Sequence, residues 1–170
     1  MAAMIDWKYY PQNAEATDLL KGVVGCFEQL EQRVTSDVHK FESNKVLEIL
    51  RPKLRKMGFE VEDKEKGSRI SVPVLFGERG KWQKSFQVDA YHESGKTVIE
   101  IEAGRAFTNF QFLKDIFEAC VMHNVEYLAV AVRKTYLGTK DYGKILEFMD
   151  TLYASGKLGI PLRGIMIIGY

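Results

Sequence analysis

The sequence predicts an α/β protein in which a mixed central sheet is flanked by helices. Residues 59–103 alternate between apolar and polar side chains in the manner of antiparallel strands. Residues 126–169 read instead as an apolar strand, an amphipathic helix and a second apolar strand, which is the pattern of a parallel crossover. The 170 residues, of which 46% are apolar, suffice for one hydrophobic core. We therefore expect a single domain over residues 1–170 with the element order α, α, β meander, α, β, α, β.

Two helices are expected before the first strand. An apolar stripe at helical spacing runs through residues 14–34 and includes Cys26, which we interpret as a small core residue. A second stripe extends from Leu47 to Met57, and Gly58 follows it as a helix stop. Because both helices are amphipathic, each is expected to cover a face of the sheet.

Strands of the meander are expected at residues 59–65, 69–76, 85–91 and 97–103. A two-residue or four-residue loop around Ser94-Gly95 gives cross-strand partners whose numbers sum to 189, so Asp89 faces Glu100. A three-residue loop mixes the two faces and is rejected. The chosen register pairs the apolar residues of one core face: Phe86 with Ala103, Val88 with Ile101, and Ala90 with Ile99.

The last part of the chain alternates helix and strand. Thr108 and Gln111 form a capping-box pattern that opens a helix reaching about His123. Its apolar stripe is read as Phe110, Leu113, Phe117 and Cys120, with Cys120 as a core residue. A buried strand at 126–133 follows, then a helix at 141–154 and a buried strand at 164–169.

Composition and charge exclude several classes of protein. A net charge of +1 argues against a polybasic protein that binds nucleic acid by bulk charge alone, although residues 40–84 carry twelve basic and seven acidic side chains. No apolar run approaches the length of a membrane-spanning helix, and residues 1–10 contain no secretory signal. Two cysteines are too few for a disulfide framework. A reduced, cytoplasmic location without a membrane is expected.

Three carboxylates converge on the face of the meander opposite the paired apolar residues. Asp89 lies on one strand, and Glu100 and Glu102 lie on the next. Like charges facing one another across two strands are unfavourable, and a divalent cation would compensate them. Oxygen ligands suit Mg²⁺, and neither His nor Cys is placed to make the site zinc-like. An isolated E-x-E is common on a solvated sheet face, but here a facing Asp and an α-β-α-β continuation accompany it.

This order of a helix, a meander carrying Asp and then E-x-E, a helix and a strand resembles the restriction-endonuclease-like PD-(D/E)XK nuclease superfamily. The motif is Asp89, ten residues, then Glu100-Ile101-Glu102. Val88 stands where the motif has Pro, and Glu102 replaces the usual Lys, as in the BamHI-type restriction enzymes. The resemblance covers about residues 38–135 and implies a restriction-endonuclease-like core there, with the helix and strand of residues 141–169 as an extension.

The resemblance also implies roles for residues. Asp89 and Glu100 would bind Mg²⁺, for which Mn²⁺ would substitute, with the Ile101 carbonyl as a further ligand, and Glu102 would orient or deprotonate the attacking water. Candidates for an additional acid from the first core helix are Glu42 and Glu48. Candidates for neutralising phosphate charge are Arg79, Lys81, Lys84 and Arg105.

The expected function is therefore that of a Mg²⁺-dependent endonuclease acting on DNA in a prokaryotic restriction, repair or mobile-element setting. Two alternatives remain open: a nuclease-like module that binds nucleic acid or assembles without catalysis, and an interaction protein without metal. A homodimer is a common way for a small nuclease to cut both strands. The target sequence, the choice between DNA and RNA, and the oligomeric state do not follow from the sequence.

Overall fold

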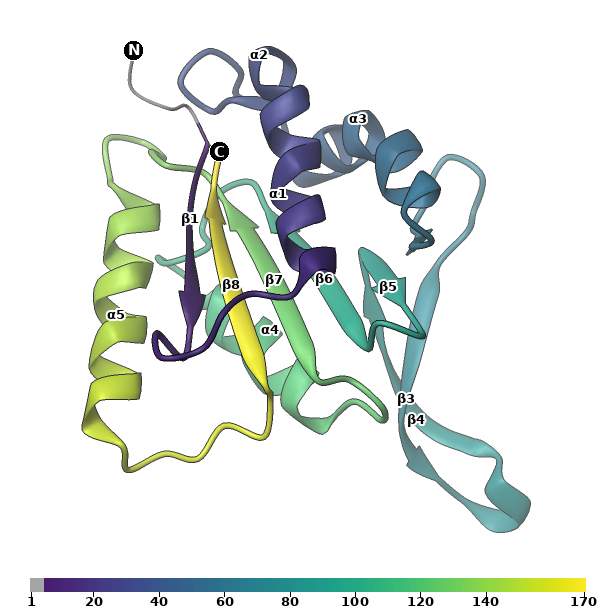
Figure 1. Cartoon of the computed structure of the whole chain (residues 1–170). Helices are drawn as coiled ribbons and strands as arrows, with labels where there is room; N and C mark the ends of the chain where they lie inside the picture. The colour runs from purple at the N-terminus through teal and green to yellow at the C-terminus, as the bar shows by residue number, and fades with distance from the viewer. Residues whose placement is uncertain (1–4) are drawn as a thin grey trace.

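The computed structural model describes residues 5–170 and has a mixed six-stranded sheet with helices on both faces (Figure 1). This confirms the expected fold class at the level of an α/β protein with a mixed sheet. The elements are β1 (Asp6–Tyr10), α1 (Asp18–Gln29), α2 (Glu31–Val34), α3 (Ser43–Lys56), β2 (Glu60–Val61), β3 (Ile70–Phe76), η1 (Glu78–Gly80), β4 (Trp82–Val88), β5 (Ala90–His92), β6 (Thr97–Glu102), α4 (Gln111–Val121), β7 (Tyr127–Val132), α5 (Asp141–Ser155) and β8 (Gly164–Gly169).

The strand order in the sheet is β1-β8-β7-β6-β5-β2. Strands β6, β7 and β8 are parallel, whereas β1, β5 and β2 pair antiparallel with their neighbours. The predicted crossover from β7 through α5 to β8 is thus confirmed. Among residues 5–170, no helix is long and apolar enough to cross a membrane.

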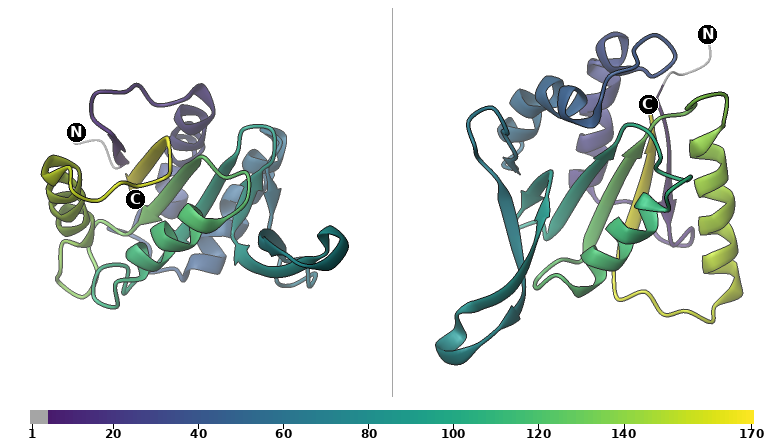
Figure 2. Two further views of the ribbon diagram at one scale, coloured as in Figure 1. Left: turned by 90° about the horizontal axis from the view of Figure 1, so that it is seen from below. Right: turned by 180° about the vertical axis from the view of Figure 1, so that it is seen from behind.

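The sheet is covered on both faces, so its central strands are buried almost throughout (Figure 2). Helices α1, α2 and α3 pack with one set of side chains, which includes Ile99 and Ile101 of β6. Helices α4 and α5 pack on the other face, with Val98 and Val130 among their neighbours. This double coverage explains why β7 and β8 read as continuous apolar runs in the sequence.

Strand β1 was not expected from the sequence. It carries Asp6 and Lys8 between larger side chains, and it pairs as the edge strand of the sheet with β8. Tyr10 at its end is fully buried and donates a hydrogen bond of 2.6 Å to Asp150 of α5. The expected absence of a leader rested on residues 1–10, of which the first four lie outside the described residues.

Replacement of Gly164 by Ala is expected to destabilise the protein by about 1–3 kcal/mol, because the buried Tyr9 ring leaves no room for a side chain. A Cβ atom at residue 164 would lie 1.8 Å from the Tyr9 hydroxyl oxygen. The matched variant Gly143→Ala, in helix α5 with no atom within 4 Å of its added Cβ, should instead stabilise by about 0.5–1 kcal/mol. Urea denaturation measures both changes, and equal effects of the two variants would contradict the packing argument.

The helices depart from the sequence prediction in two places. The stripe of residues 14–34 forms two helices, α1 and α2, which meet at Leu30, and Thr17 caps the first by accepting a hydrogen bond from the Leu20 N–H. The capping box at Thr108 is wrong, because α4 begins at Gln111 after Phe110, which adopts a left-handed conformation.

The predicted meander is also wrong in part. The register sum of 189 is confirmed for β5 and β6, where Ala90 pairs with Ile99. It fails before Asp89, because β4 leaves the main sheet and forms a separate two-stranded sheet with β3. Val88 therefore pairs with Ile70 rather than Ile101, and Phe86 pairs with Val72 rather than Ala103.

Candidate functional site

Strand β6 directs its two glutamates to the α4 side of the sheet. Ile99 and Ile101 point to the α1 and α3 side, so Glu100 and Glu102 alternate with them and share a face with the buried Val98. Both glutamates are partly buried. The predicted placement of Glu100 and Glu102 on one face is confirmed, but the face is covered by a helix rather than open.

Asp89 occupies the break between β4 and β5. Its Oδ2 accepts a hydrogen bond of 2.7 Å from the Ile101 N–H, and its carbonyl oxygen accepts one of 2.8 Å from the Glu62 N–H. In an antiparallel ladder the N–H and C=O of one residue face the same neighbour. The Ile101 carbonyl therefore faces the side of β6 that β4 has left, where the Asp89 side chain lies.

Helix α4 adds a fourth carboxylate, that of Asp115, which the sequence analysis missed. The buried face of α4 consists of Phe112, Asp115, Ile116 and Ala119, and Asp115 is only 4% exposed. Its Oδ2 has no hydrogen-bond partner within the described part of the chain. A hydrogen bond links the carboxyl groups of Asp115 and Glu102. An unpaired carboxylate oxygen in the interior calls for a proton or a cation.

The predicted stripe of α4 is therefore wrong in part, since Leu113 and Cys120 pack against the core but its two phenylalanines do not lie in it. Phe110 and Phe117 of that stripe are 56% and 68% exposed, and Cys120 is only partly buried. Cys26, by contrast, lies in the core as expected. The sequence does contain a sign of this fourth acid. Asp115 lies three residues after Phe112 and four before Ala119, a spacing that places it on the same helix face as these apolar residues.

Burial raises the pKa of all four carboxyl groups, and the charges of neighbouring acids add to the rise. The pKa of Asp89 is raised to about 6, mainly by burial, and the Ile101 N–H opposes that rise. Burial and then the charge of Asp89 raise the pKa of Glu100 well above its usual range. Burial also raises the pKa of Glu102. Burial and the charge of Glu102 raise the pKa of Asp115 to about 9.

Other charged groups surround this cluster, and the sequence analysis did not identify them. Glu62 is buried after β2, and its charge raises the pKa of Asp89, whereas the nearby Lys64 lowers it. Lys64 lies 3.8 Å from the Glu62 carboxylate. Lys114 lowers the pKa of both Glu102 and Asp115. Acidic groups outnumber the basic ones, so the cluster favours a bound cation.

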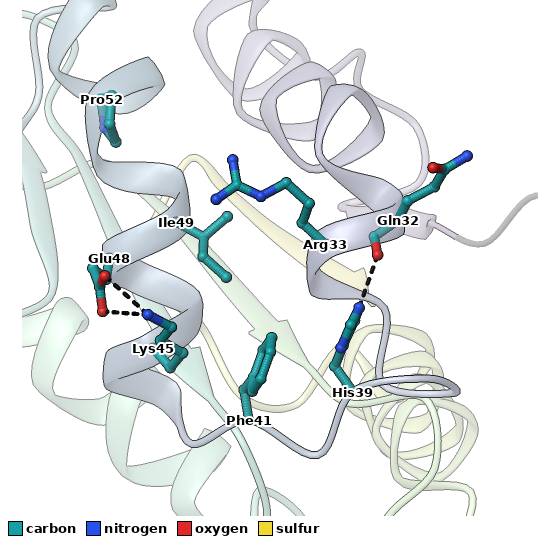
Figure 3. A pocket seen from close by; sticks show the side chains of 8 residues that line it. All are labelled: Gln32, Arg33, His39, Phe41, Lys45, Glu48, Ile49 and Pro52. Atoms are coloured by element: carbon teal, nitrogen blue, oxygen red, sulfur yellow. Dashed lines mark hydrogen bonds and ion pairs between the residues drawn. The ribbon is translucent and has the colours of Figure 1, made fainter.

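Two glutamates of the first core helix were left open as additional acids. Glu42 lines a cavity of about 340 Å³ together with Glu102. Glu48 lies 3.0 Å from the Lys45 ammonium group and lines a different cavity between α2 and α3 (Figure 3). The arrangement thus favours Glu42 as the acid beside the cluster.

Two arginines line the cavity beside Glu102. Arg105, one of the predicted phosphate-neutralising residues, lines it together with Arg133, which was not predicted. Arg133 is 9% exposed and donates a hydrogen bond to the Phe41 carbonyl oxygen. The other predicted cations lie on the β3–β4 hairpin instead, with Lys84 on β4 and with Arg79 and Lys81 before it.

The donor set agrees in its chemistry with Mg²⁺ or Mn²⁺. All its ligands are oxygen atoms, the carboxyl groups resist losing their protons together, and Asp115 Oδ2 lacks a partner. As arranged, no group of three or more His, Cys, Asp or Glu side chains in residues 5–170 is gathered closely enough to hold a metal ion. Binding would therefore require side-chain rotation around fixed backbone positions.

The fold and the cluster define an α/β protein with a buried acidic site at the end of a central strand. No protein-family model matches the chain, and comparisons with curated proteins and with solved structures give no significant match.

Proposed function

We propose that this protein is a divalent-metal-dependent nuclease that hydrolyses phosphodiester bonds in DNA. The observation that carries the proposal is the meeting of Asp89, Glu100, Glu102 and Asp115 in one partly buried cluster, in which burial raises the pKa of every carboxyl group. Such clusters of perturbed acids are typical of functional sites, and the oxygen-only donor set suits Mg²⁺. The resemblance of the Asp89 and Glu100-Ile101-Glu102 pattern to the PD-(D/E)XK nucleases supports the same reaction.

We assign the residues these roles on the strength of their positions and of the resemblance. Asp89 and Glu100 would hold the cation, and the Ile101 carbonyl faces the same side of β6 as the Asp89 carboxylate. Glu102 would accept a proton from the attacking water, since burial raises its pKa and so makes it a stronger base than an ordinary glutamate. Asp115 would hold Glu102 in place through their hydrogen bond. A bound divalent ion supplies a Lewis acid that polarises the phosphoryl oxygen and acidifies water.

Positive charge beside the cluster would offset the charge of the substrate phosphate. Arg105 and Arg133 line the cavity that Glu102 shares. Arg133 forms no ion pair with an acidic side chain in the described chain. A guanidinium group suits a phosphate oxygen because it donates two parallel hydrogen bonds.

A second candidate is a nuclease-like module that binds nucleic acid without cleaving it. The observation in its favour is the bond between Glu102 and Asp115, which engages the residue standing where the superfamily has its catalytic Lys. In that case the acids would be a remnant of a catalytic site, and binding would depend on the basic surfaces.

The proposed nuclease is tested by incubating the protein with supercoiled plasmid in Mg²⁺ or Mn²⁺, beside a reaction in EDTA. We expect nicked or linear plasmid only with the metal. The variant Glu100→Gln should be inactive, because it removes a ligand charge and keeps the side-chain shape. Glu93→Gln makes the same change at an exposed turn residue of the same hairpin and should retain activity.

Calorimetric titration with Mn²⁺ separates the two candidates. Metal binding with cleavage supports the nuclease, and nucleic-acid binding without cleavage supports the inactive module. Neither cleavage nor Mn²⁺ binding by the folded protein would refute the metal-dependent reaction.

A further inference from the structure

The β3–β4 hairpin forms an arm that extends beyond the rest of the molecule (Figures 1 and 2). We define the arm as residues 70–88. Ile70, Val72 and Val88 are buried at its base, where they pack beneath α4. Farther out, the Pro73 carbonyl accepts a hydrogen bond from the His123 N–H. Residues 74–84, which we call the outer arm, form strand pairs only with one another in the described part of the chain. Strands β3 and β4 each have seven residues and are about 20 Å long.

The outer arm is basic, and Lys84 contacts the Phe86 ring of the arm itself. Arg79, Lys81 and Lys84 accompany a single acid, Glu78, so the arm carries a net charge of +2. None of the three cations forms an ion pair with a side chain in residues 5–170. Three long cations grouped on a narrow ribbon repel one another, and this repulsion favours an anionic partner.

Large apolar side chains of the outer arm are also exposed. Leu75, Phe76 and Trp82 are 55%, 44% and 57% exposed, and Phe76 pairs directly with Trp82 across the two strands. Phe76 also contacts the His123 ring edge to face at 5.0 Å between ring centres. Exposed aromatic and aliphatic groups beside unpaired cations are typical of an interaction surface.

From these features we infer that the arm enters the major groove of duplex DNA and contacts the phosphates on either side. A two-stranded ribbon fits this groove, which is about 12 Å wide, and side chains on its edges reach the backbone. Arg79 and Lys81 at the tip would contact phosphates, and Trp82 would lie against the groove wall. The inference rests on the proposed function for the choice of DNA as the partner.

The shape of the arm argues against the other polyanions that its charge would attract. A flat anionic lipid surface would be met by a broad basic face, but the cations here lie on a narrow projection. The strand β4 continues directly into Asp89, so a duplex held by the arm adjoins the acidic cluster. Both facts favour a long, grooved polymer that spans the arm and the site.

The test is fluorescence anisotropy of a labelled duplex titrated with the protein in EDTA, so that no metal-dependent cleavage occurs, over a range of salt concentrations. We expect Arg79→Glu with Lys81→Glu to bind at least about tenfold more weakly at low salt. The plot of the logarithm of the binding constant against the logarithm of the salt concentration should become shallower by about 2. Each lost phosphate contact accounts for about 0.9 of the slope, and the variant removes two cations.

The matched control reverses two charges at the ends of α5, on the opposite edge of the sheet (Figure 1). Lys140→Glu with Lys157→Glu changes the net charge equally at exposed positions and should leave the slope nearly unchanged. Trp82 supplies a direct reporter in the variant Trp7→Phe, in which it is the one remaining Trp of the chain. Its emission should change when the duplex binds.

Several outcomes would overturn the inference. These are an unchanged slope in the arm variant, an equal loss in the two charge-reversal variants, and duplex binding without a change in Trp82 emission. Single-stranded DNA of equal length bound as tightly as the duplex would exclude groove insertion. If the protein cleaves no DNA but the arm variant loses duplex binding, the inference about the arm stands and the proposed nuclease activity is refuted. If the protein cleaves DNA and the arm variant binds duplex normally, the nuclease activity stands and the inference about the arm is refuted.

Discussion

Replacement of Asp89 by Asn is expected to reduce Mg²⁺-dependent cleavage of DNA by at least about 100-fold while leaving the fold intact. The amide oxygen of Asn can still accept the hydrogen bond that the Ile101 N–H donates to Asp89 Oδ2. The variant therefore removes the charge that holds the cation and retains the contact that positions residue 89. Cleavage rates and Mn²⁺ affinity measured on the same preparation check this result.

Asp89→Ala serves as the comparison, because it leaves the Ile101 N–H without its acceptor. That variant should lose a further 1–3 kcal/mol or so of stability, the usual cost of an unsatisfied buried donor. If Asp89→Asn retained full activity and full Mn²⁺ affinity, Asp89 would not be a metal ligand, and the proposed site would be wrong.

The metal-free protein is expected to lose stability as the pH rises, and Asp115→Asn should remove much of that loss. The pKa of Asp115 is raised from 3.8 to about 9 in the folded protein, mainly by burial. Between these values the folded state keeps a proton that the unfolded state releases, so the stabilising contribution is complete below about pH 4 and disappears as the pH approaches 9. One linked proton corresponds to about 1.4 kcal/mol per pH unit at most.

Urea denaturation in EDTA at several values between pH 5 and pH 8 measures this effect. The free energy of unfolding of the wild type, relative to that of Asp115→Asn, should fall by about 1 kcal/mol per pH unit. Asp37→Asn removes an exposed carboxylate and serves as the control. Parallel pH profiles for the wild type and Asp115→Asn would show that Asp115 does not hold a proton in the folded state.

The sequence was sufficient to predict the parts of the fold that depend on long apolar runs. Strands β7 and β8 and helix α5 lie where expected, because double coverage of the sheet leaves unbroken apolar segments with little ambiguity. Strand β1 escaped prediction because an edge strand of five residues has only one neighbour and can carry Asp6 and Lys8. Its pairing is determined by β8, more than 150 residues away along the chain.

Helix α4 illustrates the limit of periodicity. Its sequence offers two stripes at helical spacing, and in the more apolar one Phe110 and Phe117 are exposed while the other two residues are only partly buried. The buried stripe contains Asp115. The free-energy cost of burying this carboxyl group is offset by its contact with Glu102 rather than by burial of apolar surface. Periodicity alone therefore favoured the wrong face and concealed the fourth acid.

The sequence predicts correctly which acids lie close together only where they belong to strands that are neighbours along the chain. Asp89 and Glu100 lie close because the β5–β6 hairpin has a short loop whose length fixes the register. Asp115, Glu62 and Arg133 reach the site through tertiary packing, for which no short-range pattern exists. The departure of β4 from the sheet was likewise hidden, because Val88 and Phe86 suit either set of partners.

The anchoring of Asp89 at the base of the arm has a consequence for motion. Two strands that pair mainly with one another are marginally stable, so we expect the outer arm to bend relative to the main body of the protein. Asp89 is held instead by hydrogen bonds from β6 and from the residue after β2, both part of the main body. Bending therefore ends at Val88 and does not reach the carboxylates, so a flexible element can follow an irregular polymer while the groups that would react with it keep their relative positions.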